Sequence, residues 1–435
     1  MTKRVAAMLG ALVLLAATLA LPVDGAAAAP AADAKVIRVP QDEATIQDAV
    51  DAATPGTLVL VSPGVYKEAV TVVPRHKNIV IRGVDRATTI LDGEFSGEKG
   101  AENGFLVFAD GVAIENMTAR NFSKNGFFWT GVDGYRGSYL TAIRNGDYGI
   151  YAFDSVNGQF DNSYASGSPD AGFYIGQCFP CNALIVDSEA EWNGLGYSGT
   201  NAGGDLLIAR SSWHDNRAGI VPNSLTSEEL SPQREATVIG NHVYDNNNTQ
   251  TPAIEIAEIA LGNGILLAGG RKNLAERNLV TGHDIAGIAV IPLPETVLSP
   301  DDPDARDFDG LDNTVRDNVT TGNQFDLVSV TNITDASDGG GNCFAGNDFT
   351  TSTPIDIQIV LPCGEPAVGY SADIALFASL LGGEKPPSAD YTTVTLPDPP
   401  ALATMSKAKT AKARPATHEP SIRVKVKALE IPTGA

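Results

Sequence analysis

Charged side chains recur at a fixed spacing in the middle of this 435-residue chain. Lys124, Asp147 and Asp170 are 23 residues apart, and Arg217 continues the series 47 residues later. Each lies two residues before a glycine that is followed by an apolar or aromatic residue. If each repeat is one turn of a stacked solenoid, the two aspartates lie roughly 5 Å apart, close to the carboxylate separation in retaining glycosidases. Like charges at that distance split their pKa values and leave one acid and one base.

These four residues and Asp154 are the candidate catalytic residues. Asp147 and Asp170 would transfer protons, and Lys124 or Arg217 would neutralise a uronate sugar. The alternative is that the aspartates only cap backbone amides at turns, which predicts the same spacing and stays open.

A second column of residues follows the same glycines by two positions. In a strand, alternate side chains leave the core, so the pattern predicts an outward ladder of flat rings on which a sugar can stack. A loop or the C-terminal segment covering these rings is the alternative. The predicted substrate-binding residues are Phe128, Tyr151 and Tyr174, with Phe153 beside them and Gln177 and Asn201 at the far end.

An acidic insertion at residues 292–311 is the candidate metal site. Asp304, Asp307 and Asp309 could supply several of the six to eight oxygens that calcium takes. The insertion lacks EF-hand spacing, so a solvated acidic loop is the alternative. Calcium is the one cofactor considered, because the staggered positions of His214, His242 and His283 disfavour a shared zinc or copper site.

The spacing of the glycines predicts the repeating unit of structure that positions these side chains. Three short strands and three turns fill each interval of about 23 residues, and such a turn is too thin to bury its own apolar residues. Stacking the turns builds one continuous core, whereas a β-propeller blade needs about 40 residues. The anchors are Gly126-Phe127, Gly149-Ile150, Gly172-Phe173, Gly196-Tyr197, Gly219-Ile220, Gly264-Ile265 and Gly287-Ile288.

We therefore predict an all-β chain with a single right-handed parallel β-helix of about ten rungs over residues 35–365. Asn, Asp or Ser at strand ends, such as Asn241, Asn278 and Asn318, would form the corners. Residues 44–53 predict an amphipathic helix that caps the first rung. Residues 366–435 are rich in Pro, Ala and Lys and predict a largely disordered, basic C-terminal extension.

The first residues are typical of a targeting signal. Residues 1–34 combine a basic start, an apolar stretch and small residues, so they predict a signal peptide and a secreted protein. An oxidising compartment favours disulfides, and proximity favours pairing Cys178 with Cys181 and Cys343 with Cys363. No later segment is apolar enough to predict a transmembrane helix.

The net charge of −22 argues against nucleic acid and anionic membranes as partners. An anionic polysaccharide would need a local basic patch or bridging cations. Neither the charge nor the repeat predicts an oligomeric state.

The repeat and its N-terminal entry resemble the pectin-lyase-like superfamily. The segments IQDAV at 46–50 and GVYKE at 64–68 are similar to the opening rung of pectinesterase-like proteins. Residues 147–155 and 168–178 resemble secreted bacterial β-helix repeat proteins. The resemblance implies the fold, but the polygalacturonase, pectinesterase and pectate-lyase signatures are missing. Residues 148–155 resemble an alginate-epimerase loop without its histidine, so no reaction is implied.

Two functions follow as hypotheses. The first is a secreted protein that binds or modifies an extracellular polysaccharide along the aromatic and acidic face, with uronate-containing polymers among the candidate substrates. If it is an enzyme, it is lyase-like, glycoside-hydrolase-like or epimerase-like. The second is a non-catalytic surface or adhesion scaffold whose basic extension holds an acidic wall polymer.

Overall fold

The computed structural model describes residues 35–95, 102–330, 339–381, 385–416 and 419–434. The expected signal peptide, residues 1–34, lies outside these ranges. Within them, no helix is both long enough and apolar enough to cross a bilayer.

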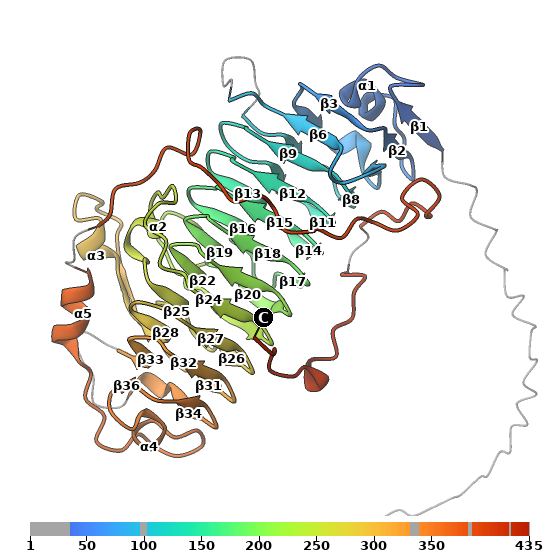
Figure 1. The fold of residues 1–435 in the computed structure, drawn as a ribbon. Coiled ribbons are helices and arrows are strands. Elements are labelled where there is room, and N and C mark those ends of the chain that lie inside the picture. Colours follow the sequence, from blue (N-terminus) through green and yellow to red (C-terminus); the bar gives the residue numbers. More distant parts are fainter. Residues whose placement is uncertain (1–34, 96–101, 331–338, 382–384, 417–418, 435) are drawn as a thin grey trace, which may run out of the picture. The chain divides into compact units, whose positions relative to one another are not determined.

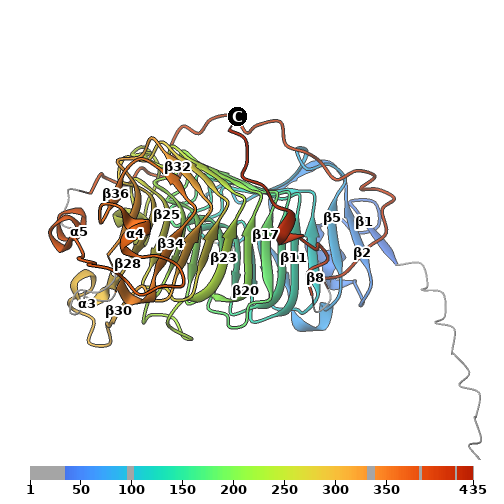
Figure 2. The ribbon, with the colours of Figure 1, turned by 90° about the horizontal axis from the view of Figure 1, so that it is seen from below.

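Three parallel sheets run along the axis of a β-helix (Figures 1 and 2). Sheet A consists of β1 (Val36–Val39), β2 (Leu58–Val61), β5 (Val80–Gly83), β8 (Val112–Glu115), β11 (Asp133–Ser138), β14 (Val156–Asp161), β17 (Ala183–Val186), β20 (Gly203–Ala209), β23 (Arg234–Ile239), β26 (Leu274–Glu276), β31 (Thr314–Arg316) and β34 (Cys343–Ala345). Sheet B consists of β3 (Gly64–Tyr66), β6 (Thr89–Asp92), β9 (Thr118–Arg120), β12 (Thr141–Ile143), β15 (Tyr164–Ser166), β18 (Glu189–Glu191), β21 (Ser212–His214), β24 (His242–Tyr244), β27 (Leu279–Thr281), β32 (Val319–Thr321) and β35 (Asp348–Phe349). Sheet C consists of β4 (Val70–Val72), β7 (Phe105–Val107), β10 (Phe127–Thr130), β13 (Tyr148–Phe153), β16 (Ala171–Gly176), β19 (Leu195–Thr200), β22 (Ala218–Asn223), β25 (Asn263–Ala268), β28 (Ala286–Ile291), β33 (Phe325–Ser329) and β36 (Ser352–Thr353).

The remaining elements are short. The helices are α1 (Ile46–Asp51), α2 (Ile256–Ile259), α3 (Glu295–Leu298), α4 (Ile357–Val360) and α5 (Ile374–Leu381), with 3₁₀ turns η1 (Pro74–His76), η3 (Gly339–Gly341) and η4 (Val426–Ala428). An antiparallel pair, β29 (Leu293–Pro294) and β30 (Asp307–Phe308), closes the 292–311 insertion. Each of the three long sheets has 11 or 12 strands, slightly more than the ten rungs predicted.

The predicted inward ladder is confirmed. In sheet C, Phe127 pairs with Ile150, Ile150 with Phe173 and Phe173 with Tyr197, and all four are fully buried. The ladder continues through Ile220, Ile265, Ile288 and Leu327. The long step between Gly219 and Gly264 contains β23 and β24, so the insertion stretches one rung without breaking the stack.

Buried asparagines form the corners between sheets A and B. Asn241 donates to Asn278, Asn278 to Asn318 and Asn318 to Asn347 at 2.9–3.1 Å, through both backbone and side-chain nitrogens. An asparagine side chain can replace the backbone partners that a turn loses. The strand-end pattern seen in the sequence is therefore a continuous hydrogen-bonded ladder.

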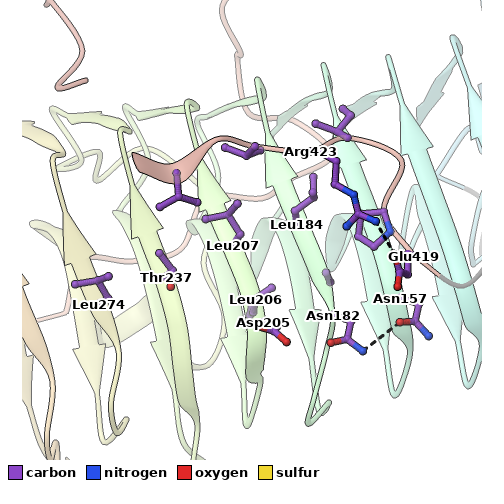
Figure 3. Close-up of a pocket in the computed structure, with 15 residues that line it drawn as sticks. Asn157, Asn182, Leu184, Asp205, Leu206, Leu207, Thr237, Leu274, Glu419 and Arg423 are labelled. Carbon is purple, nitrogen blue, oxygen red and sulfur yellow. Dashed lines mark hydrogen bonds and ion pairs between the residues drawn. The ribbon is translucent and has the colours of Figure 1, made fainter. Parts of the chain in front are cut away.

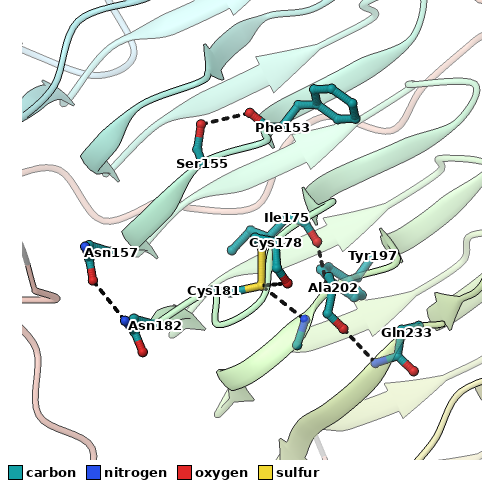
Figure 4. Close-up of a disulfide and its surroundings, with 11 residues drawn as sticks. Phe153, Ser155, Asn157, Ile175, Cys178, Cys181, Asn182, Tyr197, Ala202 and Gln233 are labelled. Carbon is teal, nitrogen blue, oxygen red and sulfur yellow. Dashed lines mark hydrogen bonds between the residues drawn. A yellow bond between two sulfur atoms is a disulfide. The ribbon is translucent and has the colours of Figure 1, made fainter. Parts of the chain in front are cut away.

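The ends and the disulfides agree with the predictions. Helix α1 buries Ile46, Ala49 and Val50 against the first rung, and Thr45 caps it by accepting from the Asp48 amide. Both predicted disulfides are present. Figure 4 shows the Cys178–Cys181 bridge at the corner after β16, beside Tyr197 and Gln233.

The C-terminal extension differs from its prediction. Composition predicts a largely disordered segment, but residues 385–416 and 419–434 lie against the β-helix and are called the strap here (Figures 1 and 2). Arginines of the β-helix hold its backbone by donating to its carbonyl oxygens. The pairs are Arg217 with Pro386 and Pro387, Arg144 with Val394, Arg86 with Ala403, Arg82 with Ala408, Ala411 and Lys412, Arg136 with Arg414, and Arg277 with Val426.

The strap also encloses a pocket against sheet A. The pocket measures about 640 Å³ and is lined by Leu184, Leu207 and Leu274 of the sheet together with Ile422 and Arg423 of the strap. Figure 3 shows the strap residues Glu419 and Arg423 beside the strands of sheet A. Along this part of the strap, Ile422, Val424 and Val426 are half-buried and the residues between them are exposed. Composition could not reveal this packing because the partners are carbonyl oxygens, which every residue has.

Replacing Arg217 with Met is expected to loosen the strap. The variant keeps an apolar stem but loses the donors to Pro386, Pro387 and Thr251. Losing charged hydrogen bonds worth about 1.5–3 kcal/mol should speed amide exchange in residues 249–255 and 388–396 roughly 10–100-fold. Hydrogen exchange read by mass spectrometry measures this. Arg210→Met, which removes an exposed pair with Asp187, is the matched control, and equal exchange in both variants would contradict the role of Arg217.

Candidate functional site

Strands β10, β13 and β16 bring the predicted aromatic residues together. Phe128, Tyr151 and Tyr174 are in register. The rings of Phe128 and Tyr151 stack with centroids 4.3 Å apart and planes at 10°, and Phe153 lies 6.0 Å from Tyr151. Phe128, Tyr151 and Phe153 are half-buried, so each keeps part of its ring open to solvent.

The third ring of the ladder is not exposed, which corrects the prediction. Tyr174 is fully buried, and its hydroxyl donates to Glu228 Oε1 at 2.6 Å. Glu228 lies in the 222–234 insertion, which folds over the rung. The alternative weighed from sequence, a covering loop, therefore holds at this position.

Two predicted substrate-binding residues hold that loop instead. The Asn201 side-chain nitrogen donates to the carbonyls of Leu225, Glu228 and Glu229, and Gln177 accepts from the Glu229 amide at 2.7 Å. Both side chains are buried. They fix the position of Glu228 rather than face a ligand.

The two central aspartates lie beside the rings, as predicted. Tyr148 donates to Asp170 Oδ2 at 2.6 Å, and its ring is 4.3 Å from that of Tyr151. Asp170 is only 4% exposed, whereas the Asp147 side chain is 23% exposed and lies 4.0 Å from Lys124 Nζ. Asp147 is therefore the carboxyl group of this pair that solvent or a ligand can reach.

Burial raises the pKa values of the carboxyls in this cluster. Desolvation raises the pKa of Asp147 from 3.8 to about 6. The positive charge of Lys124 opposes this shift, and the negative charge of Glu255 adds to it. Desolvation raises the pKa of Glu228 from 4.5 to about 7, with the Tyr174 hydrogen bond opposing the shift and Glu255 adding to it. Desolvation also holds the pKa of Asp170 well above its ordinary value. Carboxyls that are part protonated near neutral pH are suited to proton transfer.

We call Phe128, Asp147, Tyr148, Tyr151, Asp170, Tyr174 and Glu228 the tyrosine–carboxyl site. The loops around it support its position. Thr226 donates to the buried Glu295 of α3 through its amide and hydroxyl, so the 292–311 insertion braces the loop that carries Glu228. In Figure 1, α2 and α3 lie on the same side of the β-helix.

Two predicted catalytic residues lie apart from this cluster. Arg217 is fully buried and donates to Thr251 and to the strap, so its role is structural. Asp154 is exposed at the opposite end of β13 from Asp147, with a φ of 49° that marks it as a turn residue. The column of charges is thus a mixture of site and scaffold residues, because a repeat imposes the spacing on both.

The predicted calcium ligands do not gather. Asp307 accepts from the amide and hydroxyl of Thr296, and the Asp304 amide donates to Asp302. Burial raises the pKa of Asp309, with Arg271 opposing the shift. Within the described ranges, these three carboxylates do not form a set whose oxygens lie within 4.8 Å of one another. The insertion braces the neighbouring loop, and calcium binding there stays a prediction.

Sequence reasoning missed Tyr148 and Glu228. Tyr148 directly precedes an anchor glycine, and this position could have been examined as a third column. Glu228 lies in an aperiodic insertion, which the repeat cannot place.

The comparisons with known proteins agree with the geometry of the fold. Residues 103–292 match the family model of a right-handed β-helix region. No curated protein matches the sequence significantly. Among solved structures, the A-module of the Azotobacter vinelandii mannuronan C-5 epimerase AlgE4 aligns with a TM-score of 0.51 and 14% identity, over 74% of this chain and 93% of that module.

Two further structures are more distant. The A-module of AlgE6 from the same organism gives a TM-score of 0.48 at 17% identity, over 71% of this chain and 92% of that one. The pectate lyase Pel9A gives 0.44 at 17% identity, over 89% of each chain. At these identities only the fold is shared. The three sheets of this chain form a right-handed parallel β-helix.

Proposed function

We propose that the tyrosine–carboxyl site binds an extracellular polysaccharide and cleaves it by general acid–base catalysis. One observation carries the proposal: the half-open Phe128–Tyr151 stack lies beside a reachable carboxyl, Asp147, whose pKa is about 6. Flat rings at a partly wet surface suit the apolar face of a sugar. A carboxyl that titrates near neutral pH can give or take the proton that glycosidic cleavage requires.

The charges of the site favour a neutral sugar over the uronate considered from sequence. Beyond desolvation, the charges of Asp147, Glu228 and Glu255 add to the raised pKa of Asp170, and Glu255 also adds to the raised pKa values of Asp147 and Glu228. Lys124 is the cation that lowers the pKa of Asp147. Arg217, the second predicted cation, is committed to the strap. A uronate carboxylate would add to this excess of negative charge.

The proposed reaction assigns each carboxyl a task. Glu228, whose pKa of about 7 keeps it part protonated near neutral pH, donates a proton from Oε2 to the glycosidic oxygen as the bond to the anomeric carbon breaks; this Oε2 has no other hydrogen-bond partner among the described residues. Asp147, which is largely ionised above its pKa of about 6 and whose side chain is 23% exposed, takes a proton from the water that attacks that carbon. Proton and water are thus both accounted for, with one acid and one base.

The relatives support the substrate class only. The structure with the TM-score of 0.51 is named as a mannuronan C-5 epimerase, so this fold is used for polysaccharide chemistry. Two disulfides suit an oxidising compartment. We therefore propose a site of action outside the cytoplasm.

Replacing Tyr151 with Ala is expected to weaken polysaccharide binding roughly 5–30-fold, because it removes stacking worth about 1–2 kcal/mol. The measurement is calorimetry on whichever neutral polysaccharide the wild-type protein retains in an affinity-gel panel, with reducing ends assayed in parallel. The control is Tyr139→Ala, a half-buried tyrosine between sheets A and B.

Failure of the wild-type protein to retain any neutral polymer would overturn the proposal, and retention of uronate polymers alone would overturn its charge argument. Binding without any product would favour the non-catalytic scaffold.

A further inference from the structure

A second polar cluster lies on sheet B, away from the tyrosine–carboxyl site. Strands β18, β21 and β24 place Glu191, His214 and Tyr244 in register. The residues between them in these strands, Ala190, Trp213 and Val243, are fully buried, so this column faces outward. The imidazole of His214 stacks on Tyr244 with centroids 4.5 Å apart and planes at 7°.

Three potential ligand atoms converge at this point. His214 Nδ1 lies 2.8 Å from Asp215 Oδ2 and 3.9 Å from Glu191 Oε2. All three atoms lie within 4.8 Å of one another. A tetrahedral zinc ion with bonds of about 2.0–2.1 Å holds its ligand atoms roughly 3.3 Å apart, so only small side-chain shifts separate this arrangement from a coordination shell.

The surrounding residues form hydrogen bonds of the kind that orient metal ligands. Tyr164 donates to Glu191 Oε1 at 2.5 Å, which leaves Oε2 for a metal, and His214 Nε2 lies 3.1 Å from Glu189 Oε1. A carboxylate on the remote imidazole nitrogen orients the ring and raises its basicity in metal sites. The stack on Tyr244 fixes the same ring from one face.

A buried hydroxyl gives a second, independent indication. Ser166 precedes Glu191 in the same column and is 2% exposed, and its Oγ has no well-aligned hydrogen-bond partner among the described residues beyond a loose contact with the Tyr164 hydroxyl. Buried polar atoms are rarely left without a partner. A water molecule on a metal held by Glu191 would supply one.

The cluster reaches solvent at Asp215, whereas Glu191 and His214 are buried, and its charge favours a cation. The Asp215 side chain is 46% exposed, and a pocket of about 360 Å³ opens beside Glu189 and Ser212 on the same sheet. Glu189, Glu191 and Asp215 surround one imidazole. All four cysteines of the chain form disulfides, so no thiolate competes for a soft metal.

We propose that Glu191, His214 and Asp215 bind one Zn²⁺ ion and leave its fourth coordination position to water. An imidazole with two monodentate carboxylates suits zinc, whereas calcium and magnesium take oxygen ligands alone. Three protein ligands with one open position is the pattern of zinc sites that activate a bound water. This site is independent of the proposed polysaccharide chemistry.

The test uses the untagged chain stripped with a chelator, dialysed against Zn²⁺ and analysed for bound metal. We expect one zinc per chain, displaced by neither Ca²⁺ nor Mg²⁺. Glu191→Gln, Asp215→Asn and His214→Gln should each weaken binding at least about 30-fold in calorimetry with Zn²⁺. His242→Gln is the matched control on the next strand, since its ring contacts Tyr244 but is not among the three ligands.

Cobalt provides a readout of geometry. Co²⁺ in place of zinc should give the intense visible absorption of a four-coordinate site in the wild-type protein and in His242→Gln, and lose it in Glu191→Gln. Folding of each variant is checked by circular dichroism, and the two isosteric carboxylate variants keep the test valid if His214→Gln is unstable. Less than one tenth of an equivalent of zinc in the wild type, or equal zinc affinity in all variants, would overturn the proposal.

Discussion

Replacing Asp147 with Asn is expected to abolish polysaccharide cleavage and to stabilise the fold at pH 8. Activity should fall at least about 100-fold, because general acid–base groups typically contribute 10²–10⁴-fold. The free energy of unfolding at pH 8 should rise by about 1–3 kcal/mol, because folding raises the pKa of this carboxyl from 3.8 to about 6 and each pKa unit corresponds to 1.36 kcal/mol.

The sign follows from the direction of the shift. A carboxyl whose pKa is raised by folding binds protons more tightly in the folded state. It therefore destabilises the protein progressively as the pH rises from about 4 to about 6, and by a constant amount above that range. Burial causes most of this cost, Lys124 opposes it and Glu255 adds to it. An uncharged asparagine has no such cost.

Urea unfolding at pH 4, 6 and 8 measures the effect. The difference between Asp147→Asn and the wild-type protein should grow between pH 4 and pH 6 and then level off. Asp205→Asn, an exposed aspartate with a positive φ of 51° that asparagine also tolerates, should show no such growth. A variant that loses activity and also loses stability at pH 8 would mean that Asp147 holds the corner together instead of serving the site.

The period of the sequence was sufficient to predict the inward ladder and the strand-end asparagines. Both depend on nearest-neighbour stacking, in which each rung repeats the environment of the last. The same reasoning placed Asp147, Asp170, Phe128 and Tyr151 on one face, because residues at equal phase share a direction.

The 23-residue repeat did not predict the contacts that side chains of the rungs make with the insertions and with the strap. Glu228 contacts Tyr174 from an insertion that does not follow the repeat, and Asn201 and Gln177 hold this insertion in place. Arg217 occupies the same position in its repeat as Asp147 and Asp170, but its partner Pro386 lies 169 residues away in the sequence. Equal spacing predicts equal direction, but not which partner a side chain meets there.

Substitutions in the asparagine ladder should lower the free energy of unfolding more than substitutions elsewhere in the corners. Asn278 accepts from the backbone and side-chain nitrogens of Asn241, and donates to Asn318 and to the Val238 carbonyl. Its side chain is fully buried. Asn278→Ala removes one member of a continuous chain and leaves several buried polar atoms without partners, each costing about 1–3 kcal/mol.

We therefore expect Asn278→Ala to lower the free energy of unfolding by about 3–5 kcal/mol in urea denaturation at pH 7. The control is Asn162→Ala, a half-buried strand-end asparagine with a φ of 50° whose side chain donates to Asp161. It should lose about 1 kcal/mol, mainly from backbone strain. Equal losses in the two variants would contradict the ladder.

Asn278→Asp separates loss of volume from loss of hydrogen bonds. It is isosteric, but an ionised carboxylate cannot donate, so it would face the Asn318 oxygen and the Val238 carbonyl with a buried negative charge. Burial should raise the pKa of this aspartate, so that stability is lost as the pH rises from about 4 and partly recovered on acidification. Thermal unfolding at pH 4 and pH 7 decides the point. A pH-independent loss equal to that of Asn278→Ala would show that packing, and not the donor–acceptor order of the ladder, sets the stability of this corner.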